Sequence, residues 1–308
     1  MILQHLMHSS YLVRIEQISG GRVLLLRQRM RMLVSFTILI LPSALVAQNQ
    51  TRTEDVAFLS TSLGGQAVFS VVMPAQPPPS EGYPVLMILH GLGRNHRTLL
   101  ENEETMAILK TQSFLIVLPD SGSGWWIDSD YSGMRYDSLL QDVIAEVRRR
   151  YPVSASPERW GVIGWSMGGF GALHFAERHP DRVSFVGSAI GLLDFPRVKG
   201  LPEGQRFGVD PKVFGYDETS WSKENPLHNL TRLRGKDLVI VIGDQAFDRT
   251  MNENFVQMAR RVGLQPETYH IEGKHVFTTV VQGLQVILPL AEAHFRGTDR
   301  TAVSPQRQ

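Results

Sequence analysis

A serine between glycines is the residue of this chain best suited to nucleophilic chemistry. Ser166 is the centre of the box Gly164-Trp165-Ser166-Met167-Gly168, which follows the apolar run Arg159–Ile163 and precedes the glycine- and alanine-rich stretch Gly169–Ala176. This order predicts a strand, a sharp turn and a helix. A serine at such a turn is held in a strained backbone conformation that exposes its hydroxyl. The flanking glycines are expected because neighbouring backbone crowds the turn.

A serine hydroxyl needs a base to take its proton, and the base needs a carboxylate to orient it. His275 is the predicted base because, of ten histidines, it alone follows the last predicted strand in a Gly-x-His turn. Two carboxylates compete for the role of the acid, since Asp248 and Asp244 share the loop after the predicted strand Leu238–Ile242. Asp248 is preferred because it directly precedes the next predicted helix, and Asp244 remains open. All of these residues follow carboxyl ends of strands, where the sites of open α/β sheets gather.

Backbone amides are the expected donors to the oxyanion that forms when a serine attacks a carbonyl group. The amide of Met167 comes directly after the serine. The second predicted donor is the amide of Leu92, in the loop His90-Gly91-Leu92-Gly93, where glycines let the backbone approach a substrate. His90 itself is expected to brace this loop.

A second glycine-rich loop, after the predicted strand Phe114–Leu118, carries Trp125 and Trp126. The paired indoles are candidates for the wall of a substrate pocket. Packing between this loop and the rest of the fold is an equally weighted alternative. Asp120 and Asp128 are expected to fix loop backbone and not to take part in catalysis.

Several other kinds of chemistry are excluded or disfavoured. The chain has no cysteine, which excludes disulfides, thiolate nucleophiles and cysteine–zinc sites. The glycine-containing segments lack the lysine and the spacing of phosphate-binding loops, and no histidine or carboxylate pair has metal-ligand spacing. We therefore expect no cofactor and no metal. The net charge of +1 gives no reason to expect nucleic acid or an anionic membrane as a partner.

The elements that must position these residues alternate between apolar runs and helical patterns. From Thr51 onward this alternation predicts an α/β fold, with a mostly parallel sheet and helices on both faces. Val56–Ser60 and Ala67–Met73 are expected to form a leading antiparallel pair. Further strands are predicted at Val85–Leu89, Phe114–Leu118, Arg159–Ile163, Val183–Ala189, Leu238–Ile242 and Thr268–Ile271, and further helices at Tyr136–Tyr151, Arg249–Val262 and Thr279–Phe295.

One segment interrupts the alternation. Gly191–Arg234 contains four prolines, scattered aromatic residues and no clear period, and it is expected to be a loop-rich cap over the carboxyl ends of the strands. With 308 residues, 43% of them hydrophobic, the chain is long enough for one large α/β domain, predicted over residues 51–297. The polar residues 298–308 are expected to be a disordered tail.

The first 47 residues are expected to be a non-structural N-terminal extension followed by a signal peptide. Arg27, Arg29 and Arg31 precede the apolar run Met32–Leu41, and small residues lead to Ala47 and a polar stretch. This order is typical of a secretory signal peptide, so the protein is expected to be periplasmic or secreted. Met30 or Met32 is then the expected initiator. The apolar run is short for a membrane span, so no stable span is expected after cleavage. An uncleaved anchor or a buried helix is the alternative.

Taken together, these motifs resemble those of the Putative esterase family of α/β-hydrolases. This family includes S-formylglutathione hydrolase, the antigen 85 mycolyltransferases, enterochelin esterases and feruloyl esterases. The matching segments are Leu89–Gly93, Pro119–Trp126, Gly164–Ala172, Gly243–Asp248 and Gly273–His275. The resemblance implies an α/β-hydrolase fold, with Ser166 as nucleophile, Asp248 as acid, His275 as base, and amides near Leu92 and Met167 as the oxyanion hole.

The first functional hypothesis is a secreted or periplasmic serine esterase that hydrolyses carboxylic esters through an acyl-enzyme. Its partner would be a small-molecule or polymer-linked ester. An acyltransferase would use the same triad with an alcohol or sugar as the acceptor. A non-catalytic binding protein with the same fold is the third hypothesis, because a fold alone does not establish a function.

Overall fold

The computed structural model describes residues 50–197 and 208–298, which belong to one compact unit, Gln48–Gln308. The predicted N-terminal extension and signal peptide, residues 1–47, lie outside the described residues. Of the predicted tail, only Thr298 is described.

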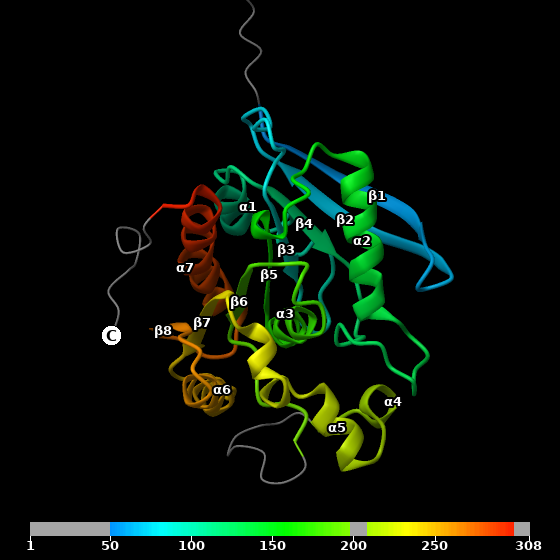
Figure 1. Ribbon diagram of the computed structural model, residues 1–308, viewed down its shortest axis with the longest axis vertical. Coiled ribbons are helices and arrows are strands. Elements are labelled where there is room, and N and C mark those ends of the chain that lie inside the picture. The colour runs from blue at the N-terminus through cyan, green and yellow to red at the C-terminus, as the bar shows by residue number, and fades with distance from the viewer. Residues whose placement is uncertain (1–49, 198–207, 299–308) are drawn as a thin grey trace, which may run out of the picture. The chain divides into compact units, whose positions relative to one another are not determined.

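Eight strands form one mixed sheet in the described part of the chain, in the order β1-β2-β4-β3-β5-β6-β7-β8 (Figure 1). β1 (Arg52–Ser60) and β2 (Gly65–Met73) are antiparallel, and β2 is also antiparallel to β4 (Leu115–Pro119). The remaining strands, all parallel to β4, are β3 (Val85–Leu89), β5 (Trp160–Trp165), β6 (Phe185–Ala189), β7 (Asp237–Gly243) and β8 (Glu267–Ile271). The predicted leading pair and mostly parallel sheet are confirmed.

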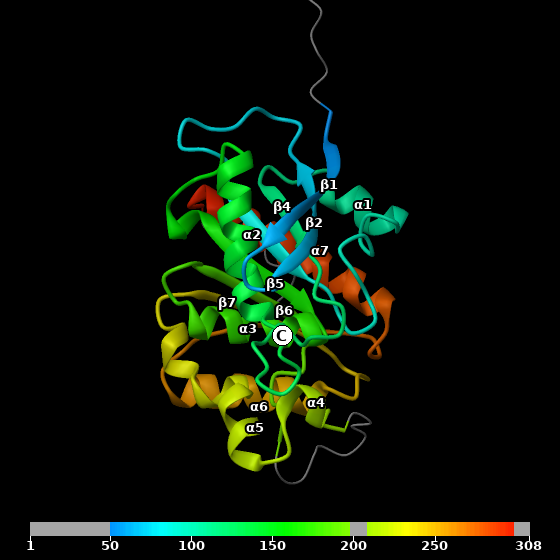
Figure 2. The ribbon, with the colours of Figure 1, turned by 90° about the vertical axis from the view of Figure 1, so that its right-hand side faces the viewer.

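The central strands are buried throughout because helices cover both of their faces. Every residue of β3, β4, β5 and β6 is buried. One hydrophobic core includes side chains of α2 (Tyr136–Arg150), α3 (Met167–Arg178) and α6 (Arg249–Arg261). The other core includes side chains of α1 (Glu103–Leu109) and α7 (Phe277–Arg296). The two views of the ribbon show these helices around the sheet (Figures 1 and 2).

The short helices are the elements that the sequence patterns do not predict. α1 spans only seven residues, and the segment predicted as a loop-rich cap contains α4 (Pro211–Phe214) and α5 (Glu218–Glu224). The 3₁₀ turns are η1 (Pro157–Arg159), η2 (Pro226–His228) and η3 (Leu230–Leu233). Each is too short to show a hydrophobic period. Among the described residues, no helix combines the length and apolar character needed to cross a membrane.

Candidate active site

Ser166 lies at the predicted turn between a strand and a helix. β5 ends at Trp165 and α3 begins at Met167, so one residue makes the turn. Its backbone has φ 54° and ψ −122°, a conformation that a residue with a side chain rarely adopts. Such strain costs about 1–3 kcal/mol and persists only where the surrounding structure imposes it. The Ser166 amide donates to the Ala189 carbonyl at 3.2 Å, which ties the turn to the next strand.

The two glycines of the box are required by close contacts with backbone. A Cβ atom on Gly164 would lie 2.2 Å from the carbonyl oxygen of Gly168. A Cβ atom on Gly168 would lie 2.0 Å from the carbonyl oxygen of Leu89. These distances are far shorter than a van der Waals contact, which confirms the expected crowding at this turn.

Ser166, His275 and Asp248 form a continuous chain of hydrogen bonds. The Ser166 hydroxyl lies 2.9 Å from His275 Nε2, and His275 Nδ1 lies 2.5 Å from Asp248 Oδ1. Because an ionised carboxylate only accepts, the network assigns the imidazole proton to Nδ1 and leaves Nε2 as the acceptor for the serine proton. This is the tautomer that a general base requires.

Asp248 is held in place by groups that face away from the histidine. It is fully buried, and its Oδ2 accepts from the Asn252 side chain at 2.9 Å. The same amide nitrogen donates to the Gly191 carbonyl at 2.7 Å. Asn252 therefore orients the carboxylate, a role that the sequence did not reveal. The ring of Phe247 packs on the imidazole of His275 at a centroid distance of 4.4 Å.

Asp244, the alternative acid, lies elsewhere. Its Oδ1 pairs with Nδ1 of His270 at 3.0 Å, and its side chain is 43% exposed. The structure therefore brings Asp248, and not Asp244, to His275.

A pocket of about 500 Å³ opens beside Ser166. It is lined by Gly91, Leu92, Arg94, Trp165, Ser166, Ile190, His275, Val276, Phe277 and Val280. The loop that carries Leu92 packs closely here, because a Cβ atom on Gly91 would lie 3.3 Å from Cβ of Ser166. Met167 opens α3, so its amide is one of those that a helix leaves without an internal acceptor. Met167 therefore follows the serine directly in the chain, and Gly91, the residue before Leu92, packs against the serine.

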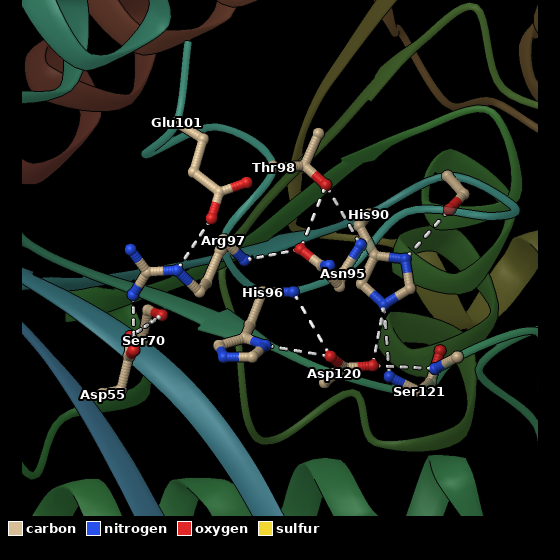
Figure 3. A network of polar contacts seen from close by, with 12 residues as sticks. Asp55, Ser70, His90, Asn95, His96, Arg97, Thr98, Glu101, Asp120 and Ser121 are labelled. Carbon is tan, nitrogen blue, oxygen red and sulfur yellow. Dashed lines mark hydrogen bonds and ion pairs between the residues drawn. The ribbon is translucent and has the colours of Figure 1, made fainter.

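His90 braces the Leu92 loop, as expected. It is buried, and its Nδ1 donates to the Gly91 carbonyl at 2.9 Å. Its Nε2 accepts from the Ser121 amide at 3.2 Å, so the ring joins the loop after β3 to the loop after β4 (Figure 3).

Asp120 ties the same two loops together. Its Oδ2 lies 2.9 Å from Nδ1 of His96 (Figure 3). Its Oδ1 accepts from the Gly122 amide at 2.9 Å. Further along the loop, the Arg97 guanidinium pairs with Asp55 of β1 at 2.5 Å. The backbone that carries Leu92 is therefore fixed from several sides.

The structure corrects the proposed position of Trp125 and Trp126. Trp126 is fully buried and donates from Nε1 to the His90 carbonyl at 3.1 Å. Trp125 is 6% exposed, and its ring stacks on Phe195 at 4.7 Å. Neither residue lines the pocket at Ser166. Burial of these large apolar surfaces in the core is the more favourable arrangement, as the packing alternative expects.

The predicted cap also lies away from this pocket in its described part. Phe214 of α4 packs edge-to-face on Trp125 at 5.2 Å, and Glu224 of α5 contacts His174 of α3 at 2.7 Å. No described residue between 208 and 234 lines the pocket. This segment covers α3 instead. Within the described residues, no group of three or more histidine, aspartate or glutamate side chains is arranged to hold a metal ion.

Comparison with known proteins identifies the family of this chain. The family model described as Putative esterase matches residues 60–287. An esterase of Mycobacterium tuberculosis (strain ATCC 25618 / H37Rv) is 25% identical over 265 residues, which cover 75% of this chain and 57% of the relative. The chain thus spans little more than half the length of that curated relative.

Solved structures share the fold. A ferulic acid esterase superposes with a TM-score of 0.67 at 21% identity, covering 80% of this chain and 99% of its own. The S-formylglutathione hydrolase of Staphylococcus aureus has a TM-score of 0.63 at 17% identity, covering 76% of this chain and 96% of its own. The expected α/β-hydrolase fold is confirmed.

Proposed function

The chain belongs to the Putative esterase family, and we propose that it is a serine esterase that hydrolyses carboxylic esters through an acyl-enzyme on Ser166. The observation that carries this proposal is the pair of hydrogen bonds from Asp248 through His275 to the serine, of 2.5 and 2.9 Å. A strained serine, a base in the right tautomer and a buried carboxylate are the parts that acyl transfer requires.

In the first half of the reaction, Nε2 of His275 takes the proton of Ser166 while the serine oxygen attacks the ester carbonyl. The tetrahedral intermediate then collapses, and His275 gives the proton to the departing alcohol. In the second half, His275 takes a proton from water, which attacks the acyl-enzyme, and the carboxylic acid is released as the proton returns to the serine. Asp248 holds the imidazole and stabilises its charged form in both halves.

The amides of Leu92 and Met167 are the proposed donors to the oxyanion. Support comes from the close packing of the Gly91 backbone on Ser166 and from the position of Met167 at the start of α3. Loss of one such donor raises the barrier by ~3 kcal/mol in characterised hydrolases.

Two experiments test this function together. A fluorophosphonate probe is expected to label Ser166, located by peptide mapping, and 4-nitrophenyl acetate is expected to be hydrolysed. Ser166→Ala and His275→Ala should abolish both signals, whereas Ser80→Ala, at an exposed serine, should abolish neither. Full hydrolysis by Ser166→Ala would refute the assignment. Absence of both label and hydrolysis in the wild type would favour the non-catalytic binding protein.

Acyl transfer to an alcohol or sugar uses the same groups, so product analysis with an added acceptor distinguishes it from hydrolysis.

We also propose that the protein is exported, on the strength of the basic and apolar pattern that ends at Ala47. The N-terminus of protein released by the producing cells should then lie near Gln48. Retention of the intact N-terminus inside the cells would contradict export.

A further inference from the structure

The pocket beside Ser166 has apolar walls and a single permanently charged side chain. Leu92, Trp165, Ile190, Phe277 and Val280 supply apolar surface, and no aspartate or glutamate is among the described residues that line it. Arg94 is the exception, and a guanidinium stays protonated at every working pH. Any ester bound at Ser166 therefore meets one positive charge that the pocket itself does not balance.

Arg94 differs from its neighbour Arg97 in what it contacts. Arg97 forms ion pairs with Asp55 and Glu101, and these two carboxylates balance its positive charge. Arg94 forms no ion pair within the described part of the chain, and its guanidinium lies over the ring of Phe277, 5.6 Å from the centroid. Since Phe277 also lines the pocket, the free donors of this guanidinium remain at the pocket wall.

The backbone that carries Arg94 is well anchored. The Arg94 amide donates to the Gly91 carbonyl at 3.2 Å, which closes the turn that contains Leu92. On the other side, the carboxylate of Asp120 accepts from His96 (Figure 3). The backbone of Arg94 is therefore held close to the proposed oxyanion donor Leu92, while its side chain is exposed and accessible to a ligand.

We propose that Arg94 selects esters that carry a carboxylate within reach of the pocket. The inference rests on the proposed ester hydrolysis at Ser166 and adds a class of substrate to it. Arginine suits this task because its planar fork pairs with both carboxylate oxygens and is weakly hydrated. The apolar walls would hold the carbon chain or ring between the ester and the anionic group. The carboxylate can belong to either the acyl or the alcohol half.

Two matched pairs of substrates test both halves. Mono-4-nitrophenyl adipate is compared with 4-nitrophenyl hexanoate for the acyl half, and 4-acetoxybenzoate with 4-acetoxybenzamide for the alcohol half. The measured quantity is the ratio of kcat/KM for the charged ester to that for the neutral one. A ratio within one protein is unaffected by loss of folded enzyme.

We expect Arg94→Gln to lower this ratio by about five- to tenfold in one pair, through KM of the charged ester. Arg94→Lys should keep part of the wild-type ratio, and added salt should reduce it. Arg260→Gln removes an exposed arginine of α6 that does not line the pocket, and it should leave the ratio unchanged.

An unchanged ratio in Arg94→Gln for both pairs would overturn the inference, and so would an equal loss in Arg260→Gln. In either case hydrolysis itself would continue, so the proposed function would stand. If the wild type hydrolyses none of the four esters and Ser166 takes no fluorophosphonate label, both proposals fall.

Discussion

At the scale of single residues, backbone strain gathers around the serine. Four non-glycine residues in the described part of the chain have positive φ: Trp125, Trp126, Ser166 and Ile190. Ile190, at φ 45°, lines the pocket, and its amide donates to the Val241 carbonyl at 2.9 Å. A β-branched residue in this region is unusual, so the neighbouring strands must impose the conformation. Strain is thus concentrated where the loops after β4, β5 and β6 approach one another.

The two aspartates of the β7–α6 loop provide a matched pair of variants. Asp248→Asn is expected to lower kcat about a thousandfold or more, because an amide can donate to Nδ1 of His275 and so favour the wrong tautomer. Asp244→Asn is expected to change kcat less than threefold, since Asp244 pairs only with the partly exposed His270 among the described residues. Steady-state kinetics on 4-nitrophenyl acetate measure both effects.

The opposite result for these two variants would contradict the assignment of Asp248 as the acid. If Asp244→Asn were the more damaging of the two, with native circular dichroism in both variants, the acid would have to be reassigned and the 2.5 Å contact of Asp248 would be structural.

At the scale of elements, the loop after β3 depends on the loop after β4. Asp120→Asn should lower kcat about tenfold with little change in KM, because the hydrogen bonds to His96 and Gly122 position the backbone of Leu92. Asp128→Asn is the control. Asp128 accepts from the amide and hydroxyl of Ser138 in the first turn of α2, as expected for a residue that fixes backbone. Its loss should lower the free energy of unfolding by about 1 kcal/mol, and Tm with it, and leave kcat near the wild-type value.

A fall in kcat of equal size in both variants would mean that Asp120 acts through general stability. A rise in KM alone would mean that it shapes binding and does not position the oxyanion donor.

The long elements of this fold could be predicted from the sequence because burial leaves a pattern. β3 is buried on both faces and appears in the chain as the unbroken apolar run Val85–Leu89. The helix predicted at Tyr136–Tyr151 occupies Tyr136–Arg150. α1 was missed because seven residues show no period, although its cap, Asn102, is a typical N-cap residue.

The site could be predicted only where chain order limits the geometry. Ser166 and His275 follow parallel strands of one sheet, so their side chains had to emerge at one edge. The direction of Trp125 is different, because a glycine-rich loop can turn an indole inward or outward, and the choice depends on rings such as Phe195 that come from elsewhere in the chain. Arg94 left no signal at all, since an arginine in a loop looks the same whether or not it has a partner.

At the scale of the whole molecule, the burial of α3 also removes an ionisable side chain from water. Every residue of α3 from Met167 to Glu177 is buried, because the helix packs on the sheet and the segment 208–234 covers it. Glu177 is 2% exposed, and its Oε1 has no hydrogen-bond partner among the described residues. Burial raises the pKa of Glu177 well above its ordinary value, although Arg232 and Arg178 offset part of the effect.

This burial makes the stability of the molecule depend on pH in a defined direction. Since the pKa of Glu177 is higher in the folded than in the unfolded chain, the folded state binds more protons between those two values, and stability is lost as pH rises through them. Glu177→Gln removes the ionisation, so the free energy of unfolding of the variant relative to wild type should increase from pH 4 to pH 8. The expected change is on the order of 1–3 kcal/mol.

Urea unfolding at both pH values measures this change. Glu272→Gln, at an exposed carboxylate, is the control that should show no such change. A difference between wild type and Glu177→Gln that stays constant with pH would mean that Glu177 ionises as easily in the folded chain as in water, and that α3 is more accessible to solvent than its packing indicates.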